Sequence, residues 1–302
     1  MLRHFEIAVV IVLVAATGFA VLVAANKLAF LNFFYIPVLV AAYFLGRRQG
    51  VLASIAAVLM VMLYATINPA LFSENNGDVP VLNVALWGGF TVLTAFVVGT
   101  LYEVKEGALR DLRQAYEGIL EILAKFIDSV DKHTKDHSVR VSTMAVQIAQ
   151  HMGLAPAEVD NVRVAGLLHD VGKVEISIEV LRKASELDAD EWAVIKSHPR
   201  KGTAMLRPIG GLLRDILPVV ECHHESFDGS GYNGLKGDAI PLGARILAVA
   251  DSYDAMVSDR PYRSGRTPKQ AIAELEACRG KQFDPAVVDA FKTVMFAQIE
   301  YA

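Results

Sequence analysis

The chain has 302 residues, a hydrophobic share of 53% and a formal net charge of -4 at pH 7. This length favours about two domains, and the negative balance gives no overall basic field that would attract a nucleic acid polymer. The two cysteines, Cys222 and Cys278, have no spacing that indicates a disulfide framework, which favours reduced thiols.

The apolar residues are concentrated near the N-terminus in four runs, at about residues 5–25, 28–45, 51–67 and 81–101. Helices of about 17–21 residues can cross about 30 Å of hydrocarbon. The centres of these runs carry no charge, which avoids a cost of about 2.5–3.5 kcal/mol per charge. The sequence therefore predicts a transmembrane region of four helices within residues 1–104. The second and third runs are short, so a re-entrant pair is an alternative there.

Basic residues flank alternate ends of these runs and predict their orientation. One side carries six of them: Arg3, Arg47, Arg48, Lys105, Arg110 and Arg113. The opposite side has only Lys27, and the segment 68–80 has neither lysine nor arginine. Because cytoplasmic loops carry an excess of Lys and Arg, both termini are predicted to be cytoplasmic.

The next segment, residues 105–127, is predicted to form a connecting helix with a coiled-coil seam. Apolar positions recur at alternating steps of four and three residues: Ala108, Leu112, Ala115, Ile119, Ile122 and Phe126. This spacing is typical of paired helices, so a homodimer through the connecting helix is predicted. The alternative is a single amphipathic helix that packs on the following domain.

Residues 128–302 are predicted to form an all-α domain. Apolar residues at 141, 144, 145, 148 and 152 share one helical face. Gly153 is typical of the end of that helix, and Pro156 of the first turn of the next. Further helices are predicted in EVDNVRVAGLLHD, DEWAVIKSHP, RDILPVVECHHE, ARILAVADSYDAM and PKQAIAELEAC. Alternating strand patterns are not found, so the whole chain is predicted to be all-α.

Histidines and acids gather in this domain in a pattern that indicates metal binding. Five histidines stand beside acids or one another: His137, His169, His198, His223 and His224. Asp251 lies within an apolar helix, where a carboxylate is costly without a cation or a hydrogen-bond partner. Imidazole and carboxylate ligands suit Mn, Fe, Co or Zn. A metal-free His–Asp pair would leave most of these imidazoles without a role, and purely structural histidines are the third alternative.

Seven sequence blocks, in order within about residues 128–295, carry a resemblance to a known family: HSVRV, LLHDVGK, SHPRKG, HHESFDGSGY, ILAVADSYDAM, DRPYR and GKQFDP. They resemble the HD-GYP phosphodiesterases, a bacterial branch of the HD metal-dependent phosphohydrolases. The resemblance implies an all-helical domain that hydrolyses cyclic di-GMP. It also implies a centre of two divalent ions, iron or manganese, with a third ion as an open alternative.

The resemblance further implies a role for each matching residue. The implied metal ligands are His137, His169, Asp170, His198, His223, His224 and Asp251. Asp170 would bridge two ions and Lys173 would contact the scissile phosphate, which makes these two the implied catalytic residues. The implied substrate-binding residues are Lys173, Tyr232, Asp254, Arg260 and Arg263.

The chain departs from the family pattern at two places. His133 stands where the family has a glutamate that binds a third ion, so two ions and the linear product pGpG are expected, with three ions and GMP as the alternative. The family tripeptide Gly-Tyr-Pro reads Gly231-Tyr232-Asn233 here, which frees the loop because proline fixes φ. Glu225 is expected to support the adjacent histidines, and Cys222 to be a core residue.

Together these features predict a phosphodiesterase of the bacterial inner membrane, with residues 1–104 in the membrane and a cytoplasmic catalytic domain at residues 128–302. Two alternatives remain open at this point. One is a receptor that binds a cyclic dinucleotide without cutting it, and the other is an HD-type hydrolase of another nucleotide.

Overall fold

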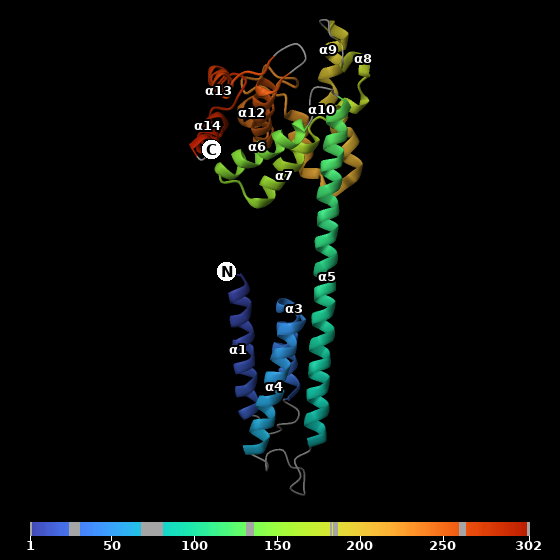
Figure 1. The fold of residues 1–302 in the computed structure, drawn as a ribbon, viewed down its shortest axis with the longest axis vertical. Coiled ribbons are helices and arrows are strands. Elements are labelled where there is room, and N and C mark those ends of the chain that lie inside the picture. The colour runs from blue at the N-terminus through green and yellow to red at the C-terminus, as the bar shows by residue number, and fades with distance from the viewer. Residues whose placement is uncertain are drawn as a thin grey trace. The chain divides into compact units, whose positions relative to one another are not determined.

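The computed structural model describes residues 2–23, 31–67, 81–130, 136–181, 183, 187–259 and 264–300. Within these ranges the chain is helical and has no strand, apart from an isolated bridge between Arg279 and Phe283, so the predicted all-α class is confirmed for the described residues. The chain divides into two compact units, Met1–Gln114 and Ala115–Ala302 (Figure 1). The predicted bounds of three regions, 1–104, 105–127 and 128–302, stay a prediction.

The N-terminal unit consists of helices that pack on one another through small residues. Its elements are α1 (Leu2–Val23), η1 (Leu31–Phe34), α3 (Tyr35–Leu45), α4 (Arg47–Ile67) and the first part of α5 (Val81–Val130). Gly46 separates α3 from α4 with a φ of 87°, which glycine adopts without strain. A Cβ on Gly50 would lie 2.7 Å from the Cα of Ala42, so glycine there permits the close approach of α3 and α4.

The expected four membrane spans are only partly matched by these helices. Two described segments are long and apolar enough to cross a membrane, Arg47–Ile67 and Leu82–Ser129, and they contain the third predicted run and all but the first residue of the fourth. The first two runs fall on shorter apolar stretches, Ala8–Thr17 and Leu31–Leu45. Core helices of soluble proteins satisfy the same criterion, so two such helices are weak evidence for a membrane. Lys27 and the segment 68–80 lie outside the described residues.

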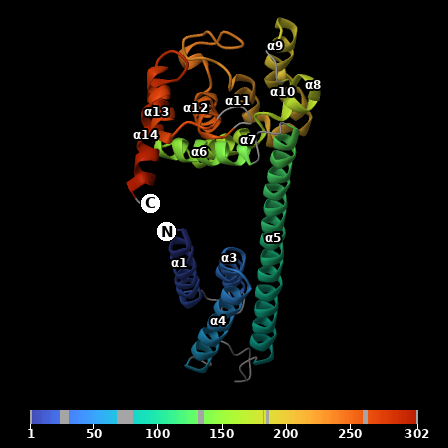
Figure 2. The same ribbon diagram turned by 45° about the horizontal axis from the view of Figure 1, so that its top comes forward.

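The C-terminal unit is built around one apolar core. Its longer helices are α6 (His137–His151), α7 (Pro156–Leu168), α12 (Leu242–Val257), α13 (Pro268–Ala277) and α14 (Pro285–Glu300). Shorter elements connect them: η3 (Val171–Glu175), α8 (Ile178–Leu181), α9 (Ala189–Lys196), α10 (His198–Leu206), η4 (Arg207–Leu212), η5 (Arg214–Ile216), α11 (Leu217–Cys222) and η6 (Gly237–Ala239). Figure 2 shows α6 and α7 crossing beneath α11 and α12, the elements between which the candidate site lies.

The sequence signals around α6 are confirmed. Val141, Ala145 and Ile148 are buried on the predicted apolar face. Gly153 has a φ of 77° just beyond the end of α6, and Pro156 is the first residue of α7. Cys222 is buried in the same core, as expected.

Helix α5 continues without interruption through the predicted connecting segment. Near its end, Leu120, Ala124 and Ile127 are buried in the core of the C-terminal unit. The predicted coiled-coil seam is not part of this core, because four of its large side chains are exposed: Leu112, Ile119, Ile122 and Phe126. The connecting helix therefore packs on the C-terminal unit with a different apolar stripe from the one that predicts pairing.

Candidate metal centre

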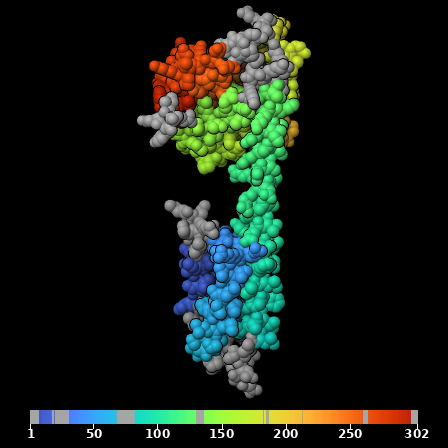
Figure 3. Space-filling view, viewed as in Figure 1, coloured from blue at the N-terminus to red at the C-terminus, as the bar shows by residue number. Residues whose placement is uncertain are grey.

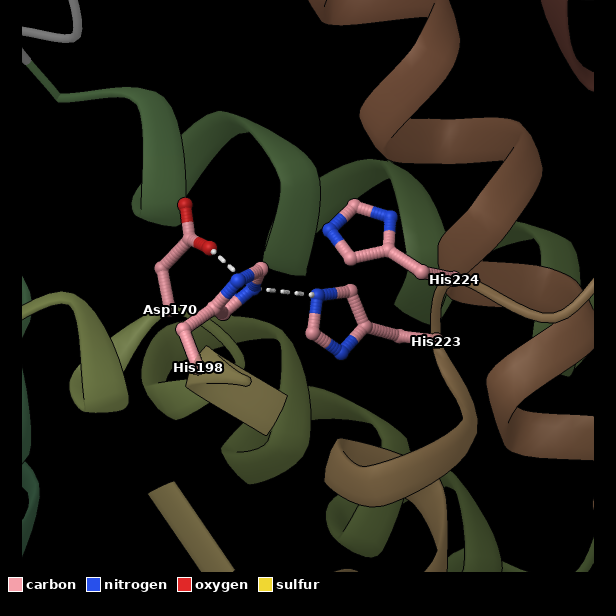
Figure 4. A group of neighbouring side chains, drawn as sticks. All are labelled: Asp170, His198, His223 and His224. Atoms are coloured by element: carbon pink, nitrogen blue, oxygen red, sulfur yellow. Dashed lines mark hydrogen bonds and ion pairs between the residues drawn. The ribbon is translucent and has the colours of Figure 1, made fainter. Parts of the chain in front are cut away.

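Two groups of side chains of the kinds that bind metals adjoin each other inside the C-terminal unit. The first is Asp170, His198, His223 and His224, drawn in Figure 4. The second is His137, His169 and Asp251. Within each group the nearest nitrogen and oxygen atoms all lie within 4.8 Å of one another. All seven predicted ligands are thus brought together, in two adjoining groups, from five parts of the sequence.

Three of the histidines follow the ends of helices, and each donates a hydrogen bond to a carbonyl of the last turn. The Nδ1 atom of His169 lies 2.8 Å from the Gly166 oxygen at the end of α7. His198 Nδ1 lies 2.7 Å from the Ile195 oxygen of α9, and His223 Nδ1 lies 2.6 Å from the Val220 oxygen of α11. The last carbonyls of a helix lack an intrahelical donor, so these rings satisfy them.

These contacts also decide which ring nitrogen is available to a metal. A carbonyl oxygen only accepts, so each Nδ1 must carry its proton. In the neutral ring the Nε2 lone pair is then free, and it points into the cluster. A second hydrogen bond of this kind orients nearly every histidine that binds a metal.

The resulting arrangement of lone pairs fits a cation. His198 Nε2 lies 3.4 Å from His223 Nε2 and 3.3 Å from Asp170 Oδ1 (Figure 4). Two lone pairs and a carboxylate oxygen repel at these separations unless a positive charge lies between them. The buried Nε2 of His169 lies 3.4 Å from Asp170 Oδ2 and makes no hydrogen bond of good geometry within the described part of the chain. The donor set therefore suits a first-row divalent ion.

His137 is held between two aspartates of α12. Its Nε2 lies 3.3 Å from Asp251 Oδ1, and its Nδ1 lies 2.8 Å from Asp254 Oδ2. Arg140 donates to both oxygens of Asp254, at 2.6 Å and 2.9 Å. Asp254 therefore orients the His137 ring and keeps Nε2 toward Asp251, while its predicted role in substrate binding stays a prediction. Arg140 was not expected at the site, although its place three residues after His137 puts both on one helix face.

The charges of the metal-free site follow from burial and from these partners. Burial opposes the charged form of His137, but hydrogen bonds to Asp251 and Asp254 outweigh it and raise the pKa to about 10. Burial lowers the pKa of His224 to about 4, against the attraction of Asp251. Burial also opposes the charge of Asp170, but Lys173 and His169 hold its pKa well below the usual range. In this state protons and Lys173 neutralise the carboxylates that would otherwise face a metal ion.

The backbone around Gly172 brings Lys173 against this cluster. A Cβ on Gly172 would collide with the carbonyl oxygen of His198 and with Gly202, so only glycine allows η3 to pack this closely on α10. Lys173 Nζ then donates to Asp170 Oδ2 at 2.7 Å. The lysine is only partly buried, so its ammonium group lies at the edge of the cluster, where it can contact a bound anion.

The glycine-rich loop, residues 228–234, is fixed by hydrogen bonds to Glu225 and not by contacts through the histidines. The buried Glu225 carboxylate accepts hydrogen bonds from the backbone of Asn233 at 2.6 Å and of Leu235 at 2.9 Å. This places the Tyr232 ring 4.9 Å from the His224 ring, with Lys196 Nζ 5.6 Å from the Tyr232 ring. The aromatic face of Tyr232 therefore lies beside the cluster, and its role in substrate binding stays a prediction.

Three predicted residues cannot be located in this site. His133, Arg260 and Arg263 lie outside the described residues. Their predicted roles, in a third metal site and in substrate binding, stay predictions.

Comparison with known proteins agrees with this geometry. The HD domain family matches residues 121–287, which is more than half of the chain. The chain is 40% identical over 185 residues to the cyclic di-GMP phosphodiesterase response regulator RpfG of Xanthomonas campestris, covering 61% of this chain and 49% of the relative. It is 38% identical over 181 residues to the 3'3'-cGAMP-specific phosphodiesterase 2 of Vibrio cholerae, covering 59% and 35%.

A third relative is a cyclic di-GMP phosphodiesterase of Thermotoga maritima, 39% identical over 175 residues that cover 57% of this chain and 48% of the relative. The chain thus spans about half the length, or less, of the curated relatives it matches. The residues that match the HD domain family, 121–287, include both side-chain groups. The chain belongs to the HD domain family.

Proposed function

We propose that the chain is a metal-dependent phosphodiesterase that hydrolyses a cyclic dinucleotide, cyclic di-GMP in the first place. The observation that carries the proposal is the pair of adjoining His/Asp groups, in which three imidazoles are fixed with Nε2 turned inward. A pair of divalent ions in such a site supplies Lewis acidity and a nucleophile at neutral pH. Iron or manganese fits the mixed imidazole and carboxylate donors.

The protein's own residues would bind and orient the substrate. Lys173, at the edge of the cluster, would supply a positive charge for the scissile phosphate. Tyr232 supplies a flat apolar face beside His224 for a purine base. Hydrolysis adds one water across one P–O bond and opens the ring to linear pGpG, and a second hydrolysis would give GMP.

The names of the relatives support a cyclic dinucleotide and leave two candidates. Two of the three relatives above are named for cyclic di-GMP and one for 3'3'-cGAMP. Cyclic di-GMP and 3'3'-cGAMP each contain two purines and two phosphodiesters. Lys173 can contact a phosphodiester in either molecule, and the Tyr232 ring can stack on a purine. The choice between them rests on contacts to the base edges, and we propose cyclic di-GMP because of the family resemblance.

Product analysis tests this proposal. The purified chain is reconstituted with Mn²⁺ or, under anaerobic conditions, Fe²⁺. It is then incubated separately with cyclic di-GMP, 3'3'-cGAMP and linear pGpG, and the products are separated by chromatography. We expect cyclic di-GMP to be converted to pGpG or GMP. Micromolar binding without turnover would instead indicate a receptor, and turnover of linear nucleotides alone would indicate another HD-type hydrolase.

We further propose that residues 1–104 anchor the enzyme in the bacterial inner membrane through four spans, with both termini and the catalytic domain in the cytoplasm. Support comes from large apolar side chains that lie exposed on the N-terminal unit, such as Leu59 and Leu63 on α4 and Leu86 and Phe90 on α5. Figure 3 draws this unit in blue to green. A reporter fused after Ser73 should report an external position, and one fused after Arg48 an internal one. The reverse pattern would refute this orientation.

We also propose that the enzyme is a homodimer that pairs through the connecting helix. The support is the exposed stripe of Leu112, Ile119, Ile122 and Phe126, which the packing of the C-terminal unit leaves uncovered. A cysteine introduced at Leu112 should form a disulfide between two chains on mild oxidation. A cysteine at the exposed Glu121 serves as a control off the seam, and equal cross-linking at both positions would contradict the pairing.

A further inference from the structure

Asp128, at the end of α5, bonds to the helix that carries His137. Its carboxylate accepts a hydrogen bond from the Ser138 hydroxyl at 2.6 Å and from the Ser138 backbone N–H at 3.2 Å. Asp128 is 5% exposed and Ser138 is fully buried. These groups are therefore removed from bulk water, where a charge-assisted hydrogen bond is strong.

This contact supplies a cap that α6 otherwise lacks. The residue before the helix, Asp136, has a φ of 57°, and its own side chain makes no capping hydrogen bond. The first N–H groups of a helix need an acceptor, and a carboxylate there also interacts favourably with the helix dipole. Asp128 provides that acceptor from another helix, directly beside the residue that begins α6, His137.

The end of α5 is firmly attached to the unit that contains the site. Leu120, Ala124 and Ile127 are at most 3% exposed and pack in its core. Asp128 follows the last of them, so its position is fixed by the packing of α5. Any shift or rotation of the end of α5 relative to this core would change the bond to Ser138.

We infer that Asp128 is a positioning residue that holds His137 in place for a metal ion by capping α6. His137 is then held from two sides. Asp128 fixes the backbone of its first turn, while Asp254 fixes its ring. The inference rests on the proposed metal centre and adds to it a contact between the end of α5 and Ser138, the residue next to the ligand His137.

Manganese binding by the purified full-length chain tests this inference without any need for turnover. The wild-type chain should bind two Mn²⁺ ions in a calorimetric titration. In Asp128→Asn the oxygen and the nitrogen of the amide cannot both accept from Ser138, so one of the two ions should bind about tenfold more weakly, as is usual when an outer partner of a ligand is removed. The second ion should keep its affinity within about twofold, and Asp128→Glu, which retains a carboxylate, should recover most of the loss.

Two further variants separate positioning from folding. Ser129→Ala changes the neighbouring exposed residue, whose hydroxyl donates to the Phe126 oxygen within α5, and should leave both affinities unchanged. Ser138→Ala removes only the hydroxyl bond and should reproduce part of the loss if Asp128→Asn proves unstable. Unchanged affinities in both the Asp128→Asn and Ser138→Ala chains would overturn the inference, as would an equal loss at both ions together with a lower melting temperature. If the wild-type chain bound no metal, the proposed function itself would fail.

Discussion

The substitution Asp254→Asn tests whether the fixed orientation of His137 matters for metal binding. Asp254 is buried and bonds to His137 at 2.8 Å and to Arg140 at 2.6 Å and 2.9 Å. Asparagine has nearly the same shape, but its amide has one accepting oxygen in place of two. When that oxygen faces His137, the amide NH2 faces Arg140 Nε, so one bond to Arg140 is lost, and the acceptor of the His137 bond is no longer a charged carboxylate.

The size of the effect follows from the number and kind of bonds changed. A hydrogen bond to a charged group contributes about 1.5–3 kcal/mol and a neutral one about 0.5–1.5 kcal/mol. The bond to His137 should therefore weaken by about 1–1.5 kcal/mol. At about 1.4 kcal/mol per factor of ten, this corresponds to about fivefold to tenfold weaker metal binding. Arg140 is 44% exposed, so the loss of its ion pair is screened by water and adds at most about 1 kcal/mol to destabilisation.

The assay is a titration of the purified chain with Mn²⁺, together with a thermal melt. Asp238→Asn is the matched control, because Asp238 also pairs with an arginine, Arg245 at 2.9 Å, but is 95% exposed. We expect one ion to bind about tenfold more weakly in Asp254→Asn, with Asp238→Asn equal to wild type. Affinities within about twofold of wild type for Asp254→Asn would show that the ring of His137 is not positioned by this carboxylate.

Three other changes have defined outcomes. His169→Ala combined with Asp170→Ala removes one residue from each of the two His/Asp groups and should abolish bound metal and turnover. Far-ultraviolet circular dichroism should show that the helices are retained. Metal content equal to wild type would rule out the ligand assignment. Gly172→Ala should lower the free energy of unfolding by about 1–3 kcal/mol, because the new Cβ would collide with backbone atoms of α10. Gly118→Ala, on the open face of α5, should leave the free energy of unfolding equal or higher. Equal denaturation midpoints for these two variants would contradict the packing of Gly172. Removal of metal with a chelator should stop turnover. Mn²⁺ or Fe²⁺ should restore turnover far better than Mg²⁺, because Mg²⁺ prefers oxygen ligands. Full recovery with Mg²⁺ would argue against metal binding by the imidazoles.

The helices of the C-terminal unit were predictable because their signals are local. Gly153 ends α6 and Pro156 begins α7 at the predicted positions, and the apolar face at 141, 145 and 148 is buried. Helix α14 was not predicted, although Pro285 marks its start. The ligand set was predicted from sequence blocks, and the structure brings those residues together without testing whether they bind metal.

The packing of α5 could not be decided from the sequence. Leu120, Ala124 and Ile127 form one apolar stripe, and Ile119, Ile122 and Phe126 form another beside it. Both have the spacing of a helix face, so periodicity alone does not tell which stripe packs within the chain. The structure assigns the first stripe to the core and leaves the second exposed.

The hydrogen bonds that orient the ligands also could not be predicted from the sequence, because they join residues that are distant in the chain. The Asp254–His137 contact spans 117 positions, and the role of Arg140 depends on it. Glu225 was expected to support the histidines next to it, but its two oxygens bind backbone N–H groups eight and ten residues further along. Spacing identifies the residue types that converge, whereas the geometry of the fold determines which carboxylate faces which donor.

The histidines that end helices explain how such a site can form without a large cost to folding. Each Nδ1–H donates to a carbonyl of a last helical turn, where intrahelical donors run out, at Gly166, Ile195 and Val220. The same bond fixes the ring and leaves Nε2 toward the cluster, so one contact serves both the fold and the site. The aliphatic core around Ile148, Leu168 and Ile246 does not depend on these rings. The metal-free chain should therefore stay folded with its ligands already oriented, because protons and Lys173 balance the carboxylates that would hold the ions.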